Sequence, residues 1–453
     1  MFQALRAAKC VAGPTALAAA GAASAGRHSS REPSGPRQRN WQAGSQLAQV
    51  VLCAHDESLY YGSYRADRFG GGIGQRTGID ESRTVPLSDT GVKRIATFSE
   101  THETLRDWAS AENWEEATRI HKGAYFTRRE NLIQEAVLQR IRQHYVSVPG
   151  YVAQAPVQMA LFRCEDEDAF RDRCATARVE RIPAVVRGVF DERAERCVVD
   201  FANKRLGGGW LSAGMVQEEK MFIERFDLGA LCARSLLNMP DPTIEANSLL
   251  GSPLTMRPNE AWLLRGAPAF AEIGWYGRTP QDGMDRFKLL NPSDDQGTAP
   301  LVVAIDAIKA DFQTYTRAHL EMMLLKAYVG FVAARDDPAL GGAAVIATGS
   351  WGCGAFFNNE RVMFAIQTLA ANLAGVDLTY HILGDGRSLG VAFAFMEDML
   401  LKKYTVDQAL DALERQCASD PEWFSKYKGA HDRKPIDEAQ AKIAEATTSR
   451  SKL

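Results

Sequence analysis

One stretch, Val198–Ile223, constrains the fold of this chain more than any other; it reads VVDFANKRLGGGWLSAGMVQEEKMFI. It begins with a short apolar run that is typical of a buried strand, and Asp200 and Asn203 stand where that strand ends. Polar side chains at the end of a buried strand commonly carry function in an α/β sheet. Three glycines follow at 207–209, and a helix is expected to open at Gln217. The stretch therefore predicts a strand, a glycine loop and a helix N-terminus around one site.

The chemistry of this stretch lies in its glycines and in the acidic pair that follows them. Because Gly207, Gly208 and Gly209 lack a Cβ, their backbone N–H groups can approach a diphosphate or ribose that a side chain would block. The carboxylates of Glu218 and Glu219 repel phosphate, but they suit acid/base catalysis on a sugar. Alone, a glycine run is more often a flexible loop, and acids in a first helical turn often only complement the helix dipole. Together and in this order they favour a catalytic site.

The stretch resembles the catalytic signature of the poly(ADP-ribose) glycohydrolases, in which VDFAN precedes a GGG loop and QEE follows after six to eight residues. The resemblance implies cleavage of the ribose–ribose O-glycosidic bond, which requires a proton donor for the leaving oxygen. We expect Glu219 to be that general acid and later the base that activates water, with Glu218 bonded to the ribose hydroxyls. Asp200 is expected to orient the pair, while Asn203 and Gln217 hold substrate hydroxyls. No metal or cofactor is expected.

A second candidate site is the loop Thr348–Phe357, reading TGSWGCGAFF, between a predicted strand and a predicted helix. A small-residue turn at a helix N-terminus directs N–H groups at an anion, although a tight βα turn is the simpler alternative. The loop resembles the family's TGNWGCGAF segment, which wraps the diphosphate and distal ribose, with Ser350 in place of asparagine. The substrate-binding residues implied are Ser350, Trp351, Gly352, Cys353, Gly354, Ala355 and Phe356. Cys353 is expected to contribute backbone and packing, because no basic residue adjoins it in sequence.

A third likeness is Glu272–Thr279, reading EIGWYGRT, which resembles the family segment whose tyrosine contacts substrate; here that residue is Tyr276. A tyrosine can stack on a base or ribose and hydrogen-bond a phosphate, although a half-buried structural tyrosine has the same sequence signal. Phe190 and Asp191 are candidates for the adenine edge, by position only. His381 and Leu383 stand where the family prefers aromatic residues, so adenine packing is expected to be weaker or rearranged.

Composition limits the partners that this chain can take. With 453 residues, 45% of them hydrophobic, the chain can bury a substantial core. Its net charge of -3 provides no basic field, so no direct DNA binding is expected, and a polyanionic substrate must be held locally. No apolar run approaches a membrane span, so no membrane partner is expected. The expected partners are poly(ADP-ribose) and poly(ADP-ribosyl)ated proteins.

The cysteines indicate neither a zinc site nor a disulfide scaffold, because they form no CxxC pair and no Cys/His cluster. We expect reduced thiols in an intracellular protein. The eight are Cys10, Cys53, Cys164, Cys174, Cys197, Cys232, Cys353 and Cys417.

The pattern of apolar residues divides the chain into four segments. Residues 1–45 are a targeting or disordered segment, 46–177 a helical accessory domain, 178–400 a macrodomain-like catalytic domain, and 401–453 C-terminal helices and a tail. Short β-branched runs separated by helices predict a mixed α/β sheet flanked by helices, and the resemblance adds the macrodomain form. The predicted strands are Ala184–Phe190, Arg196–Phe201, Ala261–Leu264, Leu301–Ile305, Ala344–Ala347 and Leu378–Leu383.

Two opposed targeting signals leave the location open. Residues 1–45 are rich in arginine and alanine and poor in acids, which is typical of a mitochondrial transit peptide or of a disordered tail. Ser451, Lys452 and Leu453 spell a peroxisomal address. The family resemblance also allows nucleus or cytoplasm.

Three functions fit the predicted site to different degrees. A macrodomain that only binds ADP-ribose needs the two loops but not Gln217, Glu218 and Glu219. A nucleotide pyrophosphatase would need a metal-binding acidic cluster near the diphosphate, and this stretch offers two glutamates only. The sequence therefore favours a glycohydrolase, with the non-hydrolysing reader as the alternative.

Overall fold

The computed structural model describes most of the chain from residue 90 to residue 423. Its described ranges are 90–110, 114–115, 132–148, 156–188, 195–211, 215–237, 254–277, 279–292, 299–310, 314–340, 345–382 and 387–423. Of two compact units, Met1–Gln42 and Ala43–Leu453, everything described belongs to the second. Both predicted targeting segments lie outside the described residues, as do Phe190, Asp191 and Leu383.

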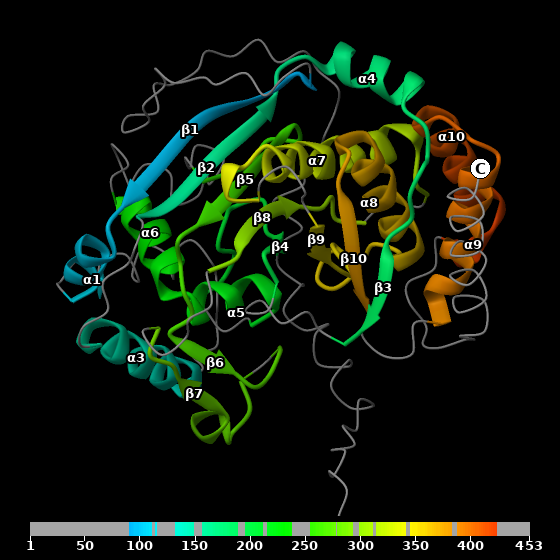
Figure 1. The fold of residues 1–453 in the computed structure, drawn as a ribbon. Coiled ribbons are helices and arrows are strands. Elements are labelled where there is room, and N and C mark those ends of the chain that lie inside the picture. The colour runs from blue at the N-terminus through cyan, green and yellow to red at the C-terminus, as the bar shows by residue number, and fades with distance from the viewer. Residues whose placement is uncertain are drawn as a thin grey trace, which may run out of the picture. The chain divides into compact units, whose positions relative to one another are not determined.

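A mixed sheet of eight strands forms the centre of the described unit, in the order β1-β2-β5-β8-β4-β9-β10-β3 (Figure 1). Strand β4 is parallel to β8 and β9, and β10 is parallel to β9 and β3. From β8 outward, β5, β2 and β1 pair antiparallel. The strands are β1 Val92–Glu100, β2 Val157–Cys164, β3 Ala184–Arg187, β4 Cys197–Ala202, β5 Glu260–Arg265, β8 Leu301–Asp306, β9 Val345–Thr348 and β10 Asp377–Ile382, with β6 Ala271–Ile273 and β7 Phe287–Leu289 in a separate two-stranded sheet.

Helices cover both faces of the sheet, with α7 and α8 on one face and α5 and α6 on the other (Figure 1). The described helices are α1 His102–Ser110, α3 Leu132–Ser147, α4 Glu167–Thr176, α5 Gln217–Glu224, α6 Phe226–Leu237, α7 Arg317–Arg335, α8 Glu360–Ala374, α9 Arg387–Leu401 and α10 Val406–Ser419, with short 3₁₀ turns at Gly283–Asp285, Pro338–Leu340 and Pro421–Trp423. The predicted fold class, a mixed α/β sheet flanked by helices, is confirmed.

Strand β8 shows why continuous apolar runs become central strands. Its odd residues Leu301, Val303 and Ile305 pack in the core below α7 and α8, whereas Val302 and Ala304 pack in the core below α5 and α6. Successive side chains of a strand point to opposite faces, so a strand covered on both sides must be apolar throughout. The predicted strands at Arg196–Phe201, Ala261–Leu264 and Leu301–Ile305 are confirmed within about one residue at each end.

The helical accessory domain predicted for 46–177 is wrong in one respect within the described residues. Strands β1 and β2 lie in this segment, and β2 pairs with β5, so the segment contributes to the same sheet as the catalytic stretch. The sequence of β2, VQMALFRC, is buried on both faces and lacks the alternation that identifies a half-exposed strand. The charged segment Cys164–Arg173 ends β2 and then opens helix α4 at Glu167, where the Asp166 side chain accepts the Ala169 N–H.

The sequences of other helices explain where they form and begin. Apolar residues at helical spacing in Leu132–Ile141 belong to α3, and Asn359 caps α8 through the Arg361 N–H. Thr405 and Gln408 form a capping box at the start of α10, which continues to Ser419.

Within the described ranges, no helix is long and apolar enough to cross a membrane. The six cysteines in those ranges are free thiols, and no group of three or more metal-ligating side chains is arranged there to hold an ion.

Gly229 in α6 makes room for Trp210, the buried residue directly after the glycine loop. A Cβ at position 229 would lie 2.6 Å from Cη2 of Trp210. We predict that Gly229→Ala lowers the free energy of unfolding by about 1–3 kcal/mol, because overpacking outweighs the better helix propensity of alanine. Urea denaturation measures this. Gly354→Ala, which enters open space, is the control and should change stability by less than about 0.5 kcal/mol; equal losses in both variants would contradict the packing argument.

Candidate active site

The candidate site lies at the carboxyl edge of the parallel strands. Because β4, β8, β9, β10 and β3 run in the same direction, their carboxyl ends share one edge of the sheet. The chain leaves β4 into the glycine loop and leaves β9 into the loop 349–358. The topology therefore brings the first two predicted constellations, far apart in sequence, to neighbouring strand ends, which is where ligands bind in open α/β sheets.

Asp200 is placed by the two-residue period of β4. Its neighbours Val198 and Ala202 point into the core below α5 and α6, so Asp200 points to the same face. The side chain is fully buried, and its charge acts on Glu218 in the first turn of α5. The structure thus brings Asp200 and the acidic pair together, as predicted.

Glu218 is held by backbone donors on both carboxylate oxygens. Its Oε1 accepts the Gly207 N–H at 2.7 Å, and its Oε2 accepts the Asn203 N–H at 2.8 Å. The side chain is 1% exposed. These two hydrogen bonds from backbone N–H groups fix the orientation of the carboxylate between the end of β4 and the glycine loop.

Glu219 is held in the same manner by the next part of the loop. Its Oε1 accepts the Gly209 N–H at 2.9 Å, and its Oε2 accepts the Val216 N–H at 3.1 Å. The second bond is the glutamate half of a helix capping box. At 8% exposure, Glu219 is the more accessible of the two carboxylates.

The glycine loop differs from the predicted phosphate cradle. The Gly207 and Gly209 amides donate to the two glutamates, and the Gly208 amide donates to the Arg205 carbonyl at 3.0 Å. The physical reason is that the acidic pair at the start of α5 accepts these donors itself. Within this geometry the loop positions carboxylates, and its contact with substrate stays a prediction.

Gly208 is the position where the missing side chain matters most. A Cβ there would lie 2.5 Å from Oε2 of Glu218 and 2.5 Å from Oε1 of Glu219. Its φ of +49° also belongs to the left-handed region that favours glycine. A glycine is therefore required because both carboxylates close on this residue.

The electrostatics of the pair raise the pKa of Glu218 well above its ordinary value. Burial is the main cause, followed by the repulsion of the nearby carboxylates of Asp200 and Glu219. The hydrogen bonds from the backbone N–H groups of Asn203 and Gly207 lower the pKa and so oppose these effects. Glu218 therefore holds a proton more readily than a glutamate in water does.

Gln217 and Asn203, predicted as substrate contacts, make internal hydrogen bonds. Gln217 accepts the Phe201 N–H at 2.7 Å and donates its amide to the Val199 carbonyl at 3.2 Å, which fixes the first residue of α5 against β4. The Asn203 side chain accepts the Arg205 N–H at 3.0 Å. Their contact with substrate stays a prediction, while their structural role was missed.

The second loop is anchored to the neighbouring strand β8. The Trp351 indole donates to the Ile305 carbonyl at 2.9 Å, and a Cβ on Gly352 would lie 2.5 Å from the Ala307 Cβ. Gly352 also has a φ of +70°. These contacts seat the turn against the end of β8, beside the end of β4.

The outer part of this loop has the donors that an anion needs. The N–H groups of Gly354, Ala355 and Phe356 donate to no acceptor among the described residues. Ser350, in place of the family's asparagine, donates its hydroxyl to Glu360 at 2.7 Å. Burial raises the pKa of the Cys353 thiol well above its ordinary value, which agrees with a packing role and not with a nucleophile.

Tyr276 lies after β6, and its side chain is 40% exposed. The Gly277 N–H donates to the Met215 carbonyl at 2.6 Å, so this segment adjoins the start of α5. Nζ of Lys220 lies 5.7 Å from the centre of the Tyr276 ring. The structure thus places the third predicted constellation next to the first, and it adds Lys220, which the sequence reasoning missed.

His381 lies near the end of β10. Its Nε2 is 3.6 Å from Oε1 of Glu195, and burial lowers the pKa of the imidazole. An almost buried histidine at this strand end replaces the aromatic residue that the family prefers. Whether adenine packing is rearranged around it stays a prediction.

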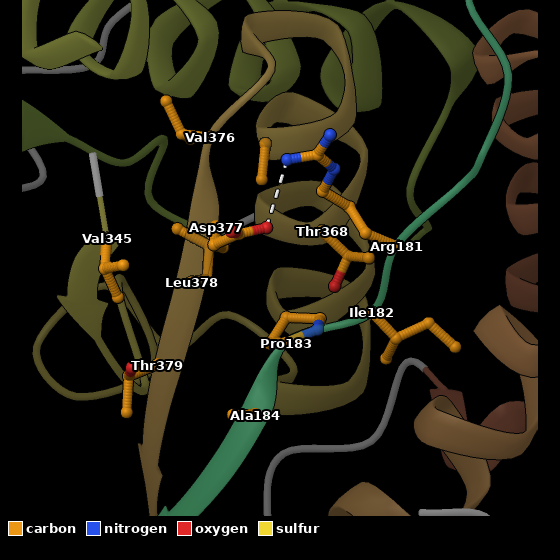
Figure 2. A pocket seen from close by; sticks show the side chains of 11 residues that line it. Arg181, Ile182, Pro183, Ala184, Val345, Thr368, Val376, Asp377, Leu378 and Thr379 are labelled. Atoms are coloured by element: carbon orange, nitrogen blue, oxygen red, sulfur yellow. Dashed lines mark hydrogen bonds and ion pairs between the residues drawn. The ribbon is translucent and has the colours of Figure 1, made fainter. Parts of the chain in front are cut away.

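A cavity of about 230 Å³ lies at the opposite edge of the sheet, at the amino ends of β3, β9 and β10 (Figure 2). Figure 2 shows Arg181 and Asp377 at its rim, where they form an ion pair at 3.0 Å. None of the predicted site residues lines this cavity. The glycine loop and the loop 349–358 lie at the carboxyl edge instead.

Comparison with known proteins supports the resemblance seen in the sequence. Residues 243–388 match the family model described as poly(ADP-ribose) glycohydrolase, macro domain fold. Poly(ADP-ribose) glycohydrolase 1 of Caenorhabditis elegans is 29% identical over 267 residues, covering 53% of this chain and 30% of the relative. Poly(ADP-ribose) glycohydrolase 2 of the same organism is 29% identical over 210 residues, covering 43% of this chain and 39% of the relative.

These matches confirm the predicted resemblance to the poly(ADP-ribose) glycohydrolase family and its macro-domain fold. The chain spans less than half the length of each of these two relatives. The stretch matched by the family model contains Tyr276 and the loop 349–358, whereas the glutamate pair precedes it. The arrangement of the pair therefore rests on the geometry described above.

The raised pKa of Glu218 predicts a pH dependence of stability. Glutamate in an unfolded chain titrates near about 4.3, so above that pH the folded protein binds more protons at this site. Its contribution to the free energy of unfolding is therefore present below about pH 4.3 and is lost as pH rises through the folded pKa. Glutamine does not titrate, so Glu218→Gln should remove this loss. The free energy of unfolding of the variant should therefore rise relative to that of the wild type as pH increases. Urea denaturation across that range measures it, and a constant difference would contradict the raised pKa.

Gly208 provides a second prediction. Gly208→Ala should separate the two carboxylates and strain the loop, lowering the free energy of unfolding by about 1–3 kcal/mol. Gly354→Ala, whose added Cβ would have no atom within 4 Å, is again the matched control. Thermal unfolding with calorimetry measures both, and unchanged stability of Gly208→Ala would mean that the carboxylates do not close on this residue.

Proposed function

We propose that this protein is a poly(ADP-ribose) glycohydrolase, which hydrolyses ribose–ribose O-glycosidic bonds and releases ADP-ribose. The observation that carries the proposal is the glutamate pair held on the glycine loop by four backbone N–H groups. Such fixed carboxylates beside an anion-binding loop suit glycoside hydrolysis of a substrate that carries diphosphates. The names of the related glycohydrolases support the same substrate class.

Glu219 is the proton donor in this proposal. It is the more exposed carboxyl, so a substrate oxygen can reach it. Its two hydrogen bonds from backbone N–H groups fix the orientation of the carboxyl group. The proton passes from the carboxyl to the leaving ribose oxygen as the glycosidic bond breaks. The resulting carboxylate then takes a proton from the attacking water.

Glu218 and Asp200 support this step from deeper positions. Glu218, almost fully buried, hydrogen-bonds the ribose hydroxyls beside the scissile bond, and Asp200 acts behind it. Three acidic groups so close together oppose full ionisation, so the pKa of Glu218 is raised and the site keeps a proton more readily than glutamates in water do.

Substrate binding is assigned to the other two constellations. The N–H groups of Gly354, Ala355 and Phe356, which have no acceptor within the described ranges, bind the diphosphate, because backbone donors at a strand-to-helix turn suit phosphate. The exposed ring of Tyr276, in the segment that follows β6, covers the ribose or base. Poly(ADP-ribosyl)ated proteins are the partners that follow from this substrate.

A non-hydrolysing reader of ADP-ribose is the second candidate. The macro-domain fold and the loop 349–358 suit either function. A reader, however, gains nothing from burying acidic groups beside its ligand, since desolvating them is unfavourable. The pair at Glu218 and Glu219 therefore favours the hydrolase.

Glu219→Gln separates the two functions. The amide keeps an acceptor for the Gly209 N–H but has no proton to give to the leaving oxygen. We predict that turnover of poly(ADP-ribose) falls by about 10²- to 10⁴-fold, while ADP-ribose affinity changes little. Release of ADP-ribose measured by chromatography, with calorimetry for binding, tests both.

The matched control is Glu103→Gln, an exposed glutamate in the first turn of α1. If first-turn glutamates only complement helix dipoles, both variants behave alike and keep nearly all activity. That outcome would remove Glu219 from the mechanism and move the assignment to Glu218 or Asp200.

A further inference from the structure

We propose that Lys220 is a positioning residue that orients Tyr276 over the substrate site, an inference that rests on the proposed function. Lys220 directly follows the acidic pair in α5, and its Nζ lies 5.7 Å from the centre of the Tyr276 ring. This is within the range of a cation–π contact. The helix that carries the acids would thus also set the ring that covers the substrate.

The ammonium group of Lys220 is itself fixed. Its Nζ lies 2.6 Å from Oε1 of Glu224, one helical turn further along α5. Glu224 is buried, and the Lys220 side chain is only 15% exposed. A cation held at this depth by a buried carboxylate offers the ring a defined point of contact.

The backbone that carries Tyr276 is tied to α5 on one side of the ring and to the residues just before α5 on the other. Oε1 of Glu224 accepts the Ile273 N–H at 2.5 Å, and the Glu224 carbonyl accepts the Phe270 N–H at 2.7 Å. On the other side, the Gly277 N–H donates to the Met215 carbonyl. These bonds place the Tyr276 backbone, but they do not choose the direction of its side chain.

Lys220 supplies a restraint on the direction of the ring. A tyrosine that is 40% exposed lacks the packing on all sides that restricts a core residue. The cation attracts the face of the ring and so favours one orientation. Direct binding of phosphate by Lys220 is disfavoured, because its charge is already paired with Glu224.

The first test uses Lys220→Met, which keeps the length of the side chain and removes its charge, and Lys220→Arg, which keeps a cation. We expect Lys220→Met to weaken ADP-ribose binding about 2- to 5-fold, the range of an exposed cation–π contact, and to raise KM with kcat nearly unchanged. Lys220→Arg should recover most of the affinity. Calorimetry and steady-state hydrolysis of poly(ADP-ribose) measure these effects.

A double-mutant cycle separates positioning from a general loss of structure. On a Tyr276→Ala background, Lys220→Met should have almost no further effect on affinity, because no ring remains to be oriented. An equal loss with and without Tyr276 would overturn the proposal, as would a kcat effect that exceeds the KM effect.

A measurement without substrate keeps this inference distinct from the proposed function. In the full chain, a ring stacked on Lys220 shifts the ε-methylene protons of that lysine upfield in NMR spectra, and Tyr276→Leu should abolish the shift. If no shift exists, the contact and the proposal both fall. If the shift is present but wild-type protein binds no ADP-ribose, the proposed function fails, and with it the role of Tyr276 at a substrate, while the contact stands.

Discussion

The candidate site depends on one interaction above the others: backbone N–H groups donate to two buried glutamates from the end of β4, from the glycine loop and from the residue that precedes α5. Carboxylates rarely lie buried beside a third acid, because each loses water and repels the others. Four amide donors offset part of that penalty and fix both groups in direction. The loop needs Gly208 because any side chain there would occupy the space between the two carboxylates.

The sheet explains why these parts meet. Parallel pairing of β4 with β8 and β9 brings the glycine loop and the loop 349–358 to one edge, and α5 packs back onto β4 through Gln217. Helices on both faces bury the central strands β4, β5 and β8 almost completely, so the site stands on a well-packed support. In the part of the chain that the structure describes, the donors on the outer part of the second loop have no acceptor, whereas those of the glycine loop are used internally. The two glycine-rich loops thus divide the work, one holding the acids and the other suited to the anion.

Sequence alone predicted much of this arrangement. Apolar runs identified the central strands, because a strand buried on both faces must be apolar throughout. The spacing of Asp200, the glycines and the acidic pair predicted a set of residues that the structure brings together. It missed β1 and β2, whose burial on a shared sheet depends on a distant partner, β5. It also misjudged the partners of the glycine amides and overlooked Lys220, since the direction of a hydrogen bond and a contact across segments are properties of the fold. The spacing of Lys220 and Glu224 by one helical turn could have predicted their ion pair, although not the contact of Lys220 with Tyr276.

The central claim is that this site cuts the ribose–ribose bond and leaves the diphosphate intact. The most direct measurement is to incubate the pure full chain with poly(ADP-ribose) and to identify the released nucleotide by mass spectrometry. The account predicts free ADP-ribose as the product. Binding without any release would indicate a reader, and release of phosphoribosyl-AMP would indicate cleavage at the diphosphate; either result would contradict the assignment of the glutamate pair to glycoside hydrolysis.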